Sequence, residues 1–353
     1  MLEFDMKNLI LFCCIVVSLV VAACSGGSQI SKIDYPNLPS IESQGGVVGT
    51  FRAKDGVSIR YASFKAASNQ GSTTQSSTQA TASVGTVVLT TGRTQFIEAY
   101  LEAIAEWQKR GYDVWAMDWR GQGLSDRLIP DARSKGHVGN FDEYLQDVDY
   151  LVQNLAKPVQ GSQNVIVGQS MGGGLVIRYA TEHEGVFQRV VAGAPLIDFA
   201  APGFLKGIIS LSASANPQGY VLGEGGDYSQ ANRTFEGNTI THDQNRFNRF
   251  HAFIDREPRL ALGAPTNQWV NEGVKSCNNF ANSTYMAKLK TPVLMFSAET
   301  DKLVSVEAQK KLAEQYPSLI KRVELAGTYH EVFLETDAVQ QKIWSEIDSF
   351  LKK

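Results

Sequence analysis

The sequence predicts an α/β fold with a mostly parallel central sheet, helices on both faces and an inserted cap. Short apolar runs alternate with helical periodicity from residue 86 onward, which is typical of βαβ units. The alternation stops over residues 196–290, where Gly, Asn, Pro and aromatic residues dominate, and resumes after them. One domain with an insertion therefore accounts for the 353 residues, and two unrelated domains are the weaker alternative.

Composition narrows the class of protein. Apolar residues make up 43% of the chain and charged residues 20%, which supplies a core and excludes a disordered or collagenous chain. With 33 Lys and Arg against 36 Asp and Glu, the net charge of -3 offers no basic field for phosphates. We therefore expect no nucleic-acid partner. The sequence has no motif that is typical of a metal or cofactor site, so we expect neither. The oligomeric state stays open.

The first 23 residues predict a lipoprotein signal peptide. An almost unbroken apolar run of 15 residues, 9–23, is too short for a comfortable bilayer span but has the length of a signal core. It ends in Val21-Ala22-Ala23-Cys24, which resembles the lipobox of bacterial lipoproteins. We expect a lipidated Cys24 and a protein anchored in a membrane of the bacterial cell envelope, namely the outer membrane, on its periplasmic or surface side. An ordinary export signal cleaved after Ala23 is the alternative.

The rest of the chain divides by composition and periodicity. Residues 24–46 are rich in Ser, Gly, Pro and Asn and predict a tether. The first part of the core is expected over residues 47–195, the cap over 196–290 and the second part of the core over 291–353. Within the first part, residues 66–83 are a low-complexity Ser, Thr, Gln and Ala stretch that predicts a loop.

Local patterns predict the elements of this core in order. A hairpin signal, Lys54-Asp55-Gly56, separates the first two expected strands. The strand patterns lie at Val47–Phe51, Val57–Phe64, Thr86–Thr90, Tyr112–Asp118, Asn164–Gly168, Arg189–Ala192, Pro292–Ser297 and Lys321–Leu325. Helical spacing follows at residues 96–107, 141–155, 171–182, 304–316 and 336–351.

Ser170 is the candidate nucleophile. Gly168-Gln169-Ser170-Met171-Gly172 matches G-x-S-x-G, in which a strand turns sharply into a helix and presents the serine hydroxyl at the edge of the sheet. The bare pattern is weak evidence, but a buried-strand run precedes it and a helical segment follows it. This strand-turn-helix context is the one that the mechanism requires.

A serine nucleophile needs a base, and the base needs an acid to orient it. In this strand-turn-helix architecture the three follow in the order Ser, acid, His along the chain, which selects His330 among the five histidines. Two carboxylates, Glu299 and Asp301, follow the penultimate expected strand. We favour Asp301 because it lies at the turn after the strand, and Glu299 is the alternative.

Ester or amide hydrolysis also requires donors for the developing oxyanion. The backbone N-H of Met171, next after the nucleophile, is one expected donor. The turn Thr90-Thr91-Gly92-Arg93-Thr94 after a central strand predicts the second, the backbone N-H of Arg93. A plain strand-to-helix turn is the alternative for that segment.

Together these motifs resemble the bacterial lysophospholipase branch of the α/β-hydrolase fold and, more distantly, monoacylglycerol lipases. The resemblance runs from about residue 47 to 352, without 66–83. It rests on Gly92-Arg93-Thr94, Asp118-Trp119-Arg120-Gly121-Gln122-Gly123-Leu124-Ser125, Gly136-His137-Val138, Gly168 to Gly172, Thr300-Asp301-Lys302-Leu303-Val304 and Tyr329-His330-Glu331. It implies the same nucleophile, acid and base. The chain departs from many hydrolases in having Thr91 where they place a histidine.

Two apolar clusters in the 196–290 segment bear on the substrate. One is Phe204, Leu205, Ile208, Ile209 and Leu211; the other is Phe247, Phe250, His251 and Ile254, flanked by Arg246 and Arg249. They predict either an acyl channel with a cationic rim or a cap packed on the core.

The functional hypothesis is therefore a lipid-anchored serine ester hydrolase. It would cleave monoacyl lipids, either lysophospholipids or monoacylglycerols, through an acyl-enzyme on Ser170. A non-enzymatic surface lipoprotein that binds an apolar ligand is the alternative from another class. Thioesterase, acyltransferase and peptidase activities share the same reacting groups and stay open.

Overall fold

The computed structural model describes residues 32–67, 83–201, 205–223 and 225–352. The predicted signal peptide, Cys24, the first part of the tether and most of the 66–83 loop lie outside these residues. Among the residues that the structure describes, no helix is both long enough and apolar enough to span a bilayer.

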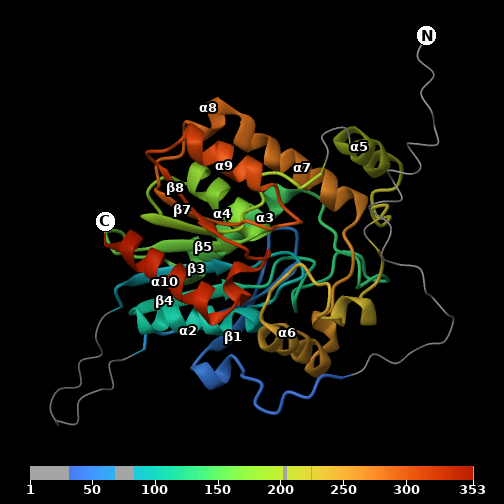
Figure 1. Cartoon of the computed structure of the whole chain (residues 1–353), viewed down its shortest axis with the longest axis horizontal. Coiled ribbons are helices and arrows are strands. Elements are labelled where there is room, and N and C mark those ends of the chain that lie inside the picture. Colours follow the sequence, from blue (N-terminus) through green and yellow to red (C-terminus); the bar gives the residue numbers. More distant parts are fainter. Residues whose placement is uncertain (1–31, 68–82, 202–204, 224, 353) are drawn as a thin grey trace.

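A mixed eight-stranded sheet forms the centre of the described chain (Figure 1). Its strands are β1 (Val47–Arg52), β2 (Ser58–Phe64), β3 (Gly85–Thr90), β4 (Tyr112–Met117), β5 (Val165–Gln169), β6 (Arg189–Gly193), β7 (Val293–Ala298) and β8 (Ile320–Leu325). Their order is β1-β2-β4-β3-β5-β6-β7-β8, with β2 antiparallel to both of its neighbours and all other pairs parallel. The predicted α/β fold with a mostly parallel sheet is confirmed.

The strand order explains where a site can form. β3 and β5 are parallel neighbours, with Leu89 opposite Val167 and Thr90 opposite Gly168. Because parallel strands end at the same edge, the turns that follow β3 and β5 lie side by side. These are the turns in which the sequence places the second oxyanion donor and the nucleophile. In open α/β sheets, ligands bind outside this carboxyl edge.

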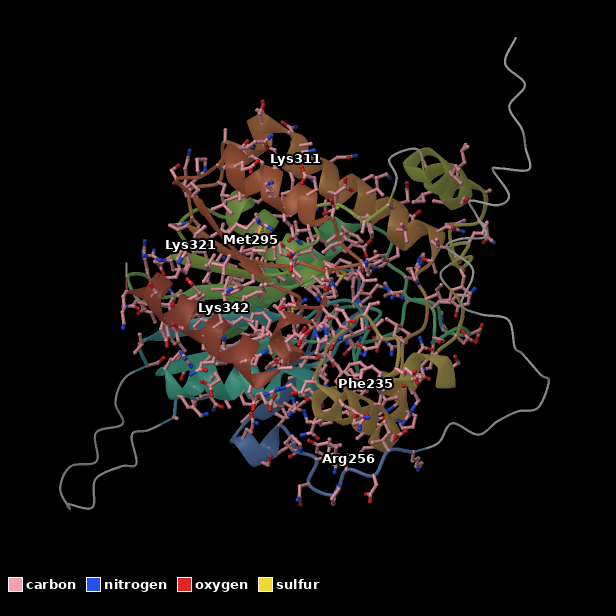
Figure 2. All side chains as sticks on the ribbon, viewed as in Figure 1. Phe235, Arg256, Met295, Lys311, Lys321 and Lys342 are labelled. Carbon is pink, nitrogen blue, oxygen red and sulfur yellow. The ribbon has the colours of Figure 1, made fainter. Side chains whose placement is uncertain are left out.

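Helices cover both faces of the sheet. α2 (Leu101–Lys109) and α10 (Asp337–Leu351) lie together on one face, and α3 (Phe141–Tyr150), α4 (Met171–Glu182) and α9 (Val306–Gln315) lie on the other (Figure 1). Met295 is fully buried among the strands, whereas Lys311 and Lys342 extend outward from α9 and α10 (Figure 2). This two-sided cover accounts for the continuous apolar runs of the central strands.

Two predicted helices differ from the structure in detail. The segment near 96–107 begins as a 3₁₀ turn (Ile97–Tyr100) before α2. The segment 141–155 is α-helical only to Tyr150 and continues as a π-helical turn (Leu151–Ala156). Helix propensity does not distinguish α-, 3₁₀- and π-helical hydrogen bonding. The periodicity of the sequence therefore predicts where a helix lies but not which of these three types it is.

An insertion of residues 194–292 separates β6 from β7. It contains α5 (Leu205–Ala215), α6 (Gln244–Arg256), α7 (Asn267–Ala281) and α8 (Ser283–Met286). On α7, Trp269 contacts Phe141 of α3 edge-to-face at 5.3 Å between ring centroids. On α6, Phe250 stacks on Phe96 at 5.0 Å. The insertion is thus attached to the core at two places, and one of them directly follows the β3 turn.

The end of the predicted tether is packed on the domain. Ile41 is 2% exposed and belongs to the core. The backbone N-H of Ile33 donates to Asp255 Oδ2 on α6 at 2.7 Å. These contacts hold Ile33 and Ile41 against the domain.

Candidate active site

Ser170 occupies a strained turn between β5 and α4. Its φ of 55° and ψ of -118° are seldom adopted by residues other than glycine. Its backbone N-H donates to the carbonyl of Gly193 at 2.8 Å. A Cβ at Gly168 would lie 2.4 Å from the carbonyl oxygen of Gly172, and one at Gly172 would lie 2.5 Å from that of Thr91. The glycines of the motif are therefore required by close backbone approach.

A hydrogen-bonded chain runs from Ser170 to Asp301. Ser170 Oγ lies 2.8 Å from His330 Nε2, and His330 Nδ1 lies 2.6 Å from Asp301 Oδ2. The other carboxylate oxygen of Asp301 accepts from the backbone N-H groups of Leu303 at 2.8 Å and Val304 at 3.1 Å. The side chain of Asp301 is fully buried and that of His330 is 3% exposed. This geometry suits a nucleophile, a general base and an orienting acid.

The other carboxylate considered for the acid lies elsewhere. Glu299 Oε2 accepts the backbone N-H of Gly327 at 2.7 Å, on the exposed side of the loop. The structure therefore brings Asp301 to His330, and Glu299 supports the loop instead.

The surroundings of His330 change its affinity for a proton. Burial disfavours the imidazolium, but the hydrogen bond and the charge of Asp301 outweigh it. The pKa of His330 is therefore raised above its ordinary value. A base of this kind accepts the serine proton readily, and it must be neutral to do so.

The turn after β3 passes directly beside the nucleophile. A Cβ at Gly92 would lie 3.4 Å from Ser170 Cβ. The next residue is Arg93, whose backbone N-H is a predicted oxyanion donor. Met171, which carries the other predicted donor, begins α4, where backbone N-H groups are not used by the helix itself. Both predicted donor positions thus adjoin the serine.

Gln122 supports this turn and was not identified as a site residue from the sequence. It is 1% exposed, and its Oε1 accepts the backbone N-H of Thr94 at 2.8 Å. Thr94 has a φ of 67°, so this bond holds a second unfavourable conformation in place. The amide nitrogen of Gln122 lies 3.9 Å from Met171 Sδ. The Asp118 to Ser125 segment, noted only for its resemblance, therefore braces the side of the site where an oxyanion would form.

The side chain of Arg93 reaches the insertion. Its guanidinium lies over the ring of Trp269, 5.3 Å from the centroid, and donates to the carbonyl of Gly263. The turn that adjoins Ser170 is thus linked through a side chain to α7.

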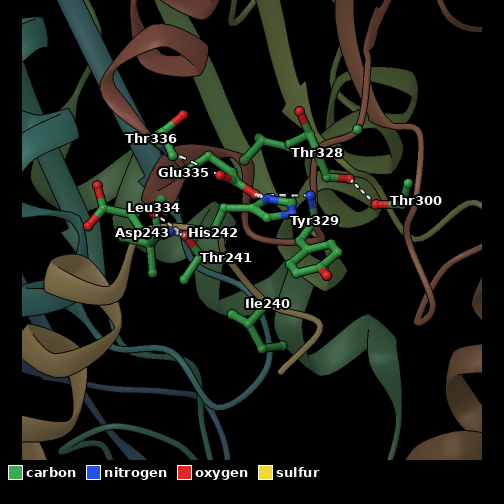
Figure 3. Close-up of polar contacts among 12 residues, drawn as sticks. Ile240, Thr241, His242, Asp243, Thr300, Thr328, Tyr329, Leu334, Glu335 and Thr336 are labelled. Atoms are coloured by element: carbon green, nitrogen blue, oxygen red, sulfur yellow. Dashed lines mark hydrogen bonds and ion pairs between the residues drawn. The ribbon is translucent and has the colours of Figure 1, made fainter. Parts of the chain in front are cut away.

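The loop that carries the base is also joined to the insertion (Figure 3). His242 Nδ1 lies 2.8 Å from the buried carboxylate of Glu335, and its ring stacks on Tyr329 at 3.7 Å. The same carboxylate oxygen accepts the backbone N-H of Tyr329 at 3.0 Å. Thr241 Oγ1 donates to the carbonyl of Leu334 at 2.7 Å. These bonds fasten residues 241–242 to the residues that follow the base.

The apolar clusters of the insertion do not form one continuous surface. Ile208 is 53% exposed and Leu211 is 73% exposed, while Phe204 lies outside the described residues. The second cluster has buried members, namely Phe247, His251 and Ile254. In one of the two interpretations Arg246 and Arg249 form a cationic rim, but both pair with Glu102 at 2.7 Å. The structure therefore favours the other interpretation, in which this cluster is packed on the core.

A family model described as "Serine aminopeptidase, S33", an α/β-hydrolase family, matches residues 81–337. Lysophospholipase L2 of Escherichia coli is 29% identical over 281 residues, which cover 76% of this chain and 80% of the relative. The monoacylglycerol lipase of Mycolicibacterium smegmatis is 22% identical over 276 residues, 76% of this chain and 88% of the relative.

Solved structures show the same fold. A soluble variant of monoglyceride lipase from Saccharomyces cerevisiae has a TM-score of 0.69 at 19% identity, covering 90% of this chain and 97% of its own. The monoacylglycerol lipase of Paleococcus ferrophilus has a TM-score of 0.62 at 19% identity, covering 83% and 98%. The family match spans most of the chain and includes the nucleophile turn, the acid loop and the base loop. The protein therefore belongs to the α/β-hydrolase family described as "Serine aminopeptidase, S33".

Proposed function

We propose that the protein is a serine carboxylic ester hydrolase that cleaves monoacyl lipids, namely lysophospholipids or monoacylglycerols. The observation that carries the proposal is the chain of bonds from Ser170 through His330 to Asp301, beside the β3 turn. A binding protein has no use for a strained serine hydrogen-bonded to a buried histidine and carboxylate. Relatives named lysophospholipase L2 and monoacylglycerol lipase support the substrate class.

The proposed reaction has two halves. Ser170 Oγ attacks the ester carbonyl carbon while His330 Nε2 takes its proton, and Asp301 stabilises the imidazolium. The backbone N-H groups of Arg93 and Met171 donate to the oxyanion of the tetrahedral intermediate. His330 then protonates the departing alcohol and leaves an acyl group on Ser170. Water, deprotonated by His330, attacks this acyl-enzyme and releases the fatty acid and the free serine.

A substrate profile tests the proposal. Purified protein is offered lysophosphatidylcholine, monoacylglycerol, triacylglycerol, an aminoacyl anilide and soluble acyl esters from acetyl to dodecanoyl, below their micelle concentrations. Each buried methylene contributes up to about 0.8 kcal/mol, so we expect kcat/KM to rise several-fold per carbon and monoacyl lipids to exceed triacylglycerols. The Ser170→Ala variant measures the background. A flat chain-length profile, or faster cleavage of the anilide, would replace this function with that of a small-ester hydrolase or a peptidase.

We also propose a lipid anchor at Cys24, which lies outside the described residues. The support is the short apolar run that ends in Val-Ala-Ala-Cys. Mass spectrometry of membrane-extracted protein should find a diacylglycerol mass on an N-terminal Cys24, and Cys24→Ser should release the domain into the soluble fraction. An unmodified mature terminus would contradict the anchor and, with it, the assignment to the bacterial cell envelope membrane.

A further inference from the structure

A buried carboxyl that the proposed reaction does not use lies next to the base. Glu331 follows His330 and is 3% exposed. The hydroxyl of Tyr100, itself 1% exposed, donates to Glu331 Oε2 at 3.2 Å. The amide of Gln95, 4% exposed, adjoins the same carboxyl. Among the described residues, no Lys or Arg forms an ion pair with Glu331, so this carboxyl has uncharged hydrogen-bond partners.

The carboxyl also adjoins the turn that passes the nucleophile. A Cβ at Gly92 would lie 3.3 Å from Glu331 Oε1 and 3.4 Å from Ser170 Cβ, so the carboxyl and the nucleophile both adjoin Gly92. The hydroxyl of Tyr100 is in contact with the backbone N-H of Gly92. The backbone N-H of Gln95 donates to the carbonyl of Gly92 at 3.4 Å. Tyr100, Gln95 and Glu331 therefore form a buried polar network behind Gly92-Arg93.

The charge of this carboxyl matters to the reaction. Burial raises the pKa of Glu331, and Asp301 adds to this, while His330, Tyr100 and Gln95 act in the opposite direction. An ionised carboxylate beside Gly92 would repel an oxyanion bound by the backbone N-H of the next residue, and it would also hold a proton on His330 more tightly. A neutral carboxyl avoids both effects and still accepts hydrogen bonds from Tyr100 and Gln95.

We propose that Glu331 is a positioning residue which acts in its neutral form and joins the loop of the catalytic base to the oxyanion turn. Through Tyr100 and Gln95 it holds Gly92, and with it the backbone N-H of Arg93, at the distance that the oxyanion requires. The inference rests on the proposed function, because it needs Arg93 to be an oxyanion donor. It assigns a role to the buried carboxyl of Tyr329-His330-Glu331 that is distinct from those of Ser170 and Asp301.

The test measures kcat and KM for a soluble acyl ester between pH 5 and pH 10. We expect Glu331→Ala to lower kcat by about 30- to 100-fold with KM within about threefold, because a misplaced oxyanion donor affects the transition state more than the bound ester. Glu331→Gln, which is neutral and of the same shape, should restore most of this loss. We expect the wild-type kcat to fall as the pH rises through the raised pKa of Glu331, and Glu331→Gln to lack this fall. Tyr100→Phe should lower kcat by about tenfold.

Glu335→Gln is the matched control. Glu335 is a buried carboxyl of the same loop, but it binds Tyr329 and His242 instead of the oxyanion turn. The Glu335→Gln substitution should lower the midpoint of thermal unfolding. Its kcat should fall with rising pH in the same way as the wild-type kcat. A merely structural role for Glu331 would produce the same pattern in its own variants.

Two results would overturn the inference. One is a kcat of Glu331→Ala within threefold of the wild type. The other is a Glu331→Gln variant as slow as Glu331→Ala at every pH, which would show that the negative charge is what the site needs. If Glu331→Ala does not fold, the other two variants are compared with the wild type: a Tyr100→Phe kcat within threefold of it, or a Glu331→Gln variant slowed about 30-fold at every pH, overturns the inference. Failure of the proposed function itself would appear in the wild type, as a flat chain-length profile or faster cleavage of the anilide, or as turnover in Ser170→Ala.

Discussion

The loops of the core and the β6–β7 insertion meet at the same site but contribute different groups to it. The core loops carry the proposed reacting groups, and their turns are held tightly: Ser170 N-H donates to Gly193, and the carboxylate of Asp301 accepts from two backbone N-H groups of its own loop. The insertion is joined to these loops through backbone and side chains: the backbone N-H of Glu331 donates to the carbonyl of Ile240 at 2.9 Å, and His242 pairs with Glu335. The difference assigns the chemistry to the edge of the sheet and the support of its loops to the insertion.

The largest effect should come from the core loops. Ser170→Ala removes the nucleophile, and we expect kcat to fall by about a million-fold, as for a triad that acts as a unit. The backbone of the turn is unchanged, so the free energy of unfolding should stay within about 1 kcal/mol of the wild type. Turnover assays and urea unfolding measure the two quantities. A kcat of Ser170→Ala within a hundredfold of the wild-type value would contradict the assignment of the chemistry to this turn.

Asp301→Asn should produce the next largest effect. Asn offers an N-H where the imidazole N-H needs an acceptor, which favours the wrong tautomer of His330, so we expect kcat to fall by about 10⁴-fold. Glu299→Gln is the control from the same loop, and its kcat should stay within a few-fold of the wild-type value. An equal fall in kcat in the two variants would mean that catalysis depends on the conformation of the loop and not on the contact of Asp301 with His330.

A pH-dependent effect on stability should arise in the insertion. Burial and then the charge of Arg233 lower the pKa of His251 to about 4, although Asp255 opposes this. Between pH 6.5 and 4 the unfolded chain therefore binds more protons at this residue than the folded protein, and stability falls as the pH falls. The loss amounts to about 3 kcal/mol at the acid end of this window.

His251→Asn provides the comparison for this effect. The variant loses ring packing at every pH, but it should lack the acid-dependent part, so its difference from the wild type narrows from pH 7 to pH 4. Urea unfolding at several pH values reads this directly. A constant difference across the range would show that His251 titrates normally and that α6 is less tightly packed than the structure indicates.

The smallest effect should come from the contact between His242 and Glu335. The histidine side chain is 41% exposed, and pairs of this kind contribute at most about 1 kcal/mol. We expect His242→Ala to lower stability by less than this and to leave kcat/KM within about threefold. A fall in kcat of more than tenfold would contradict the division between core loops and insertion, because it would show that His242 positions the base.

The sequence predicts the core well because the signals for it are local. The central strands are apolar runs of a few residues, and all eight predicted strands appear in the sheet. The turn at Ser170 needs its glycines within two residues on either side, and the order of acid and base along the chain is a property of the fold. Local patterns of this kind do not depend on what packs against them.

What the sequence does not predict depends on pairs of distant residues. Gln122 meets Thr94 across 28 positions, and Glu331 meets Tyr100 across 231. Arg246 looks like part of a cationic rim until the fold places Glu102 beside it. Which charged side chains are neutralised is decided by tertiary contacts, so a charge pattern within one helix cannot distinguish a binding surface from an ion pair.

Capture of the acyl-enzyme decides whether Ser170 is the nucleophile. The protein is mixed with an excess of a long-chain nitrophenyl ester, quenched in acid during turnover, and digested for mass spectrometry. We expect one acyl group on the peptide that contains Ser170, and none in Ser170→Ala. An acyl group on another residue, or sustained turnover by Ser170→Ala, would contradict the assignment of the chemistry to Ser170.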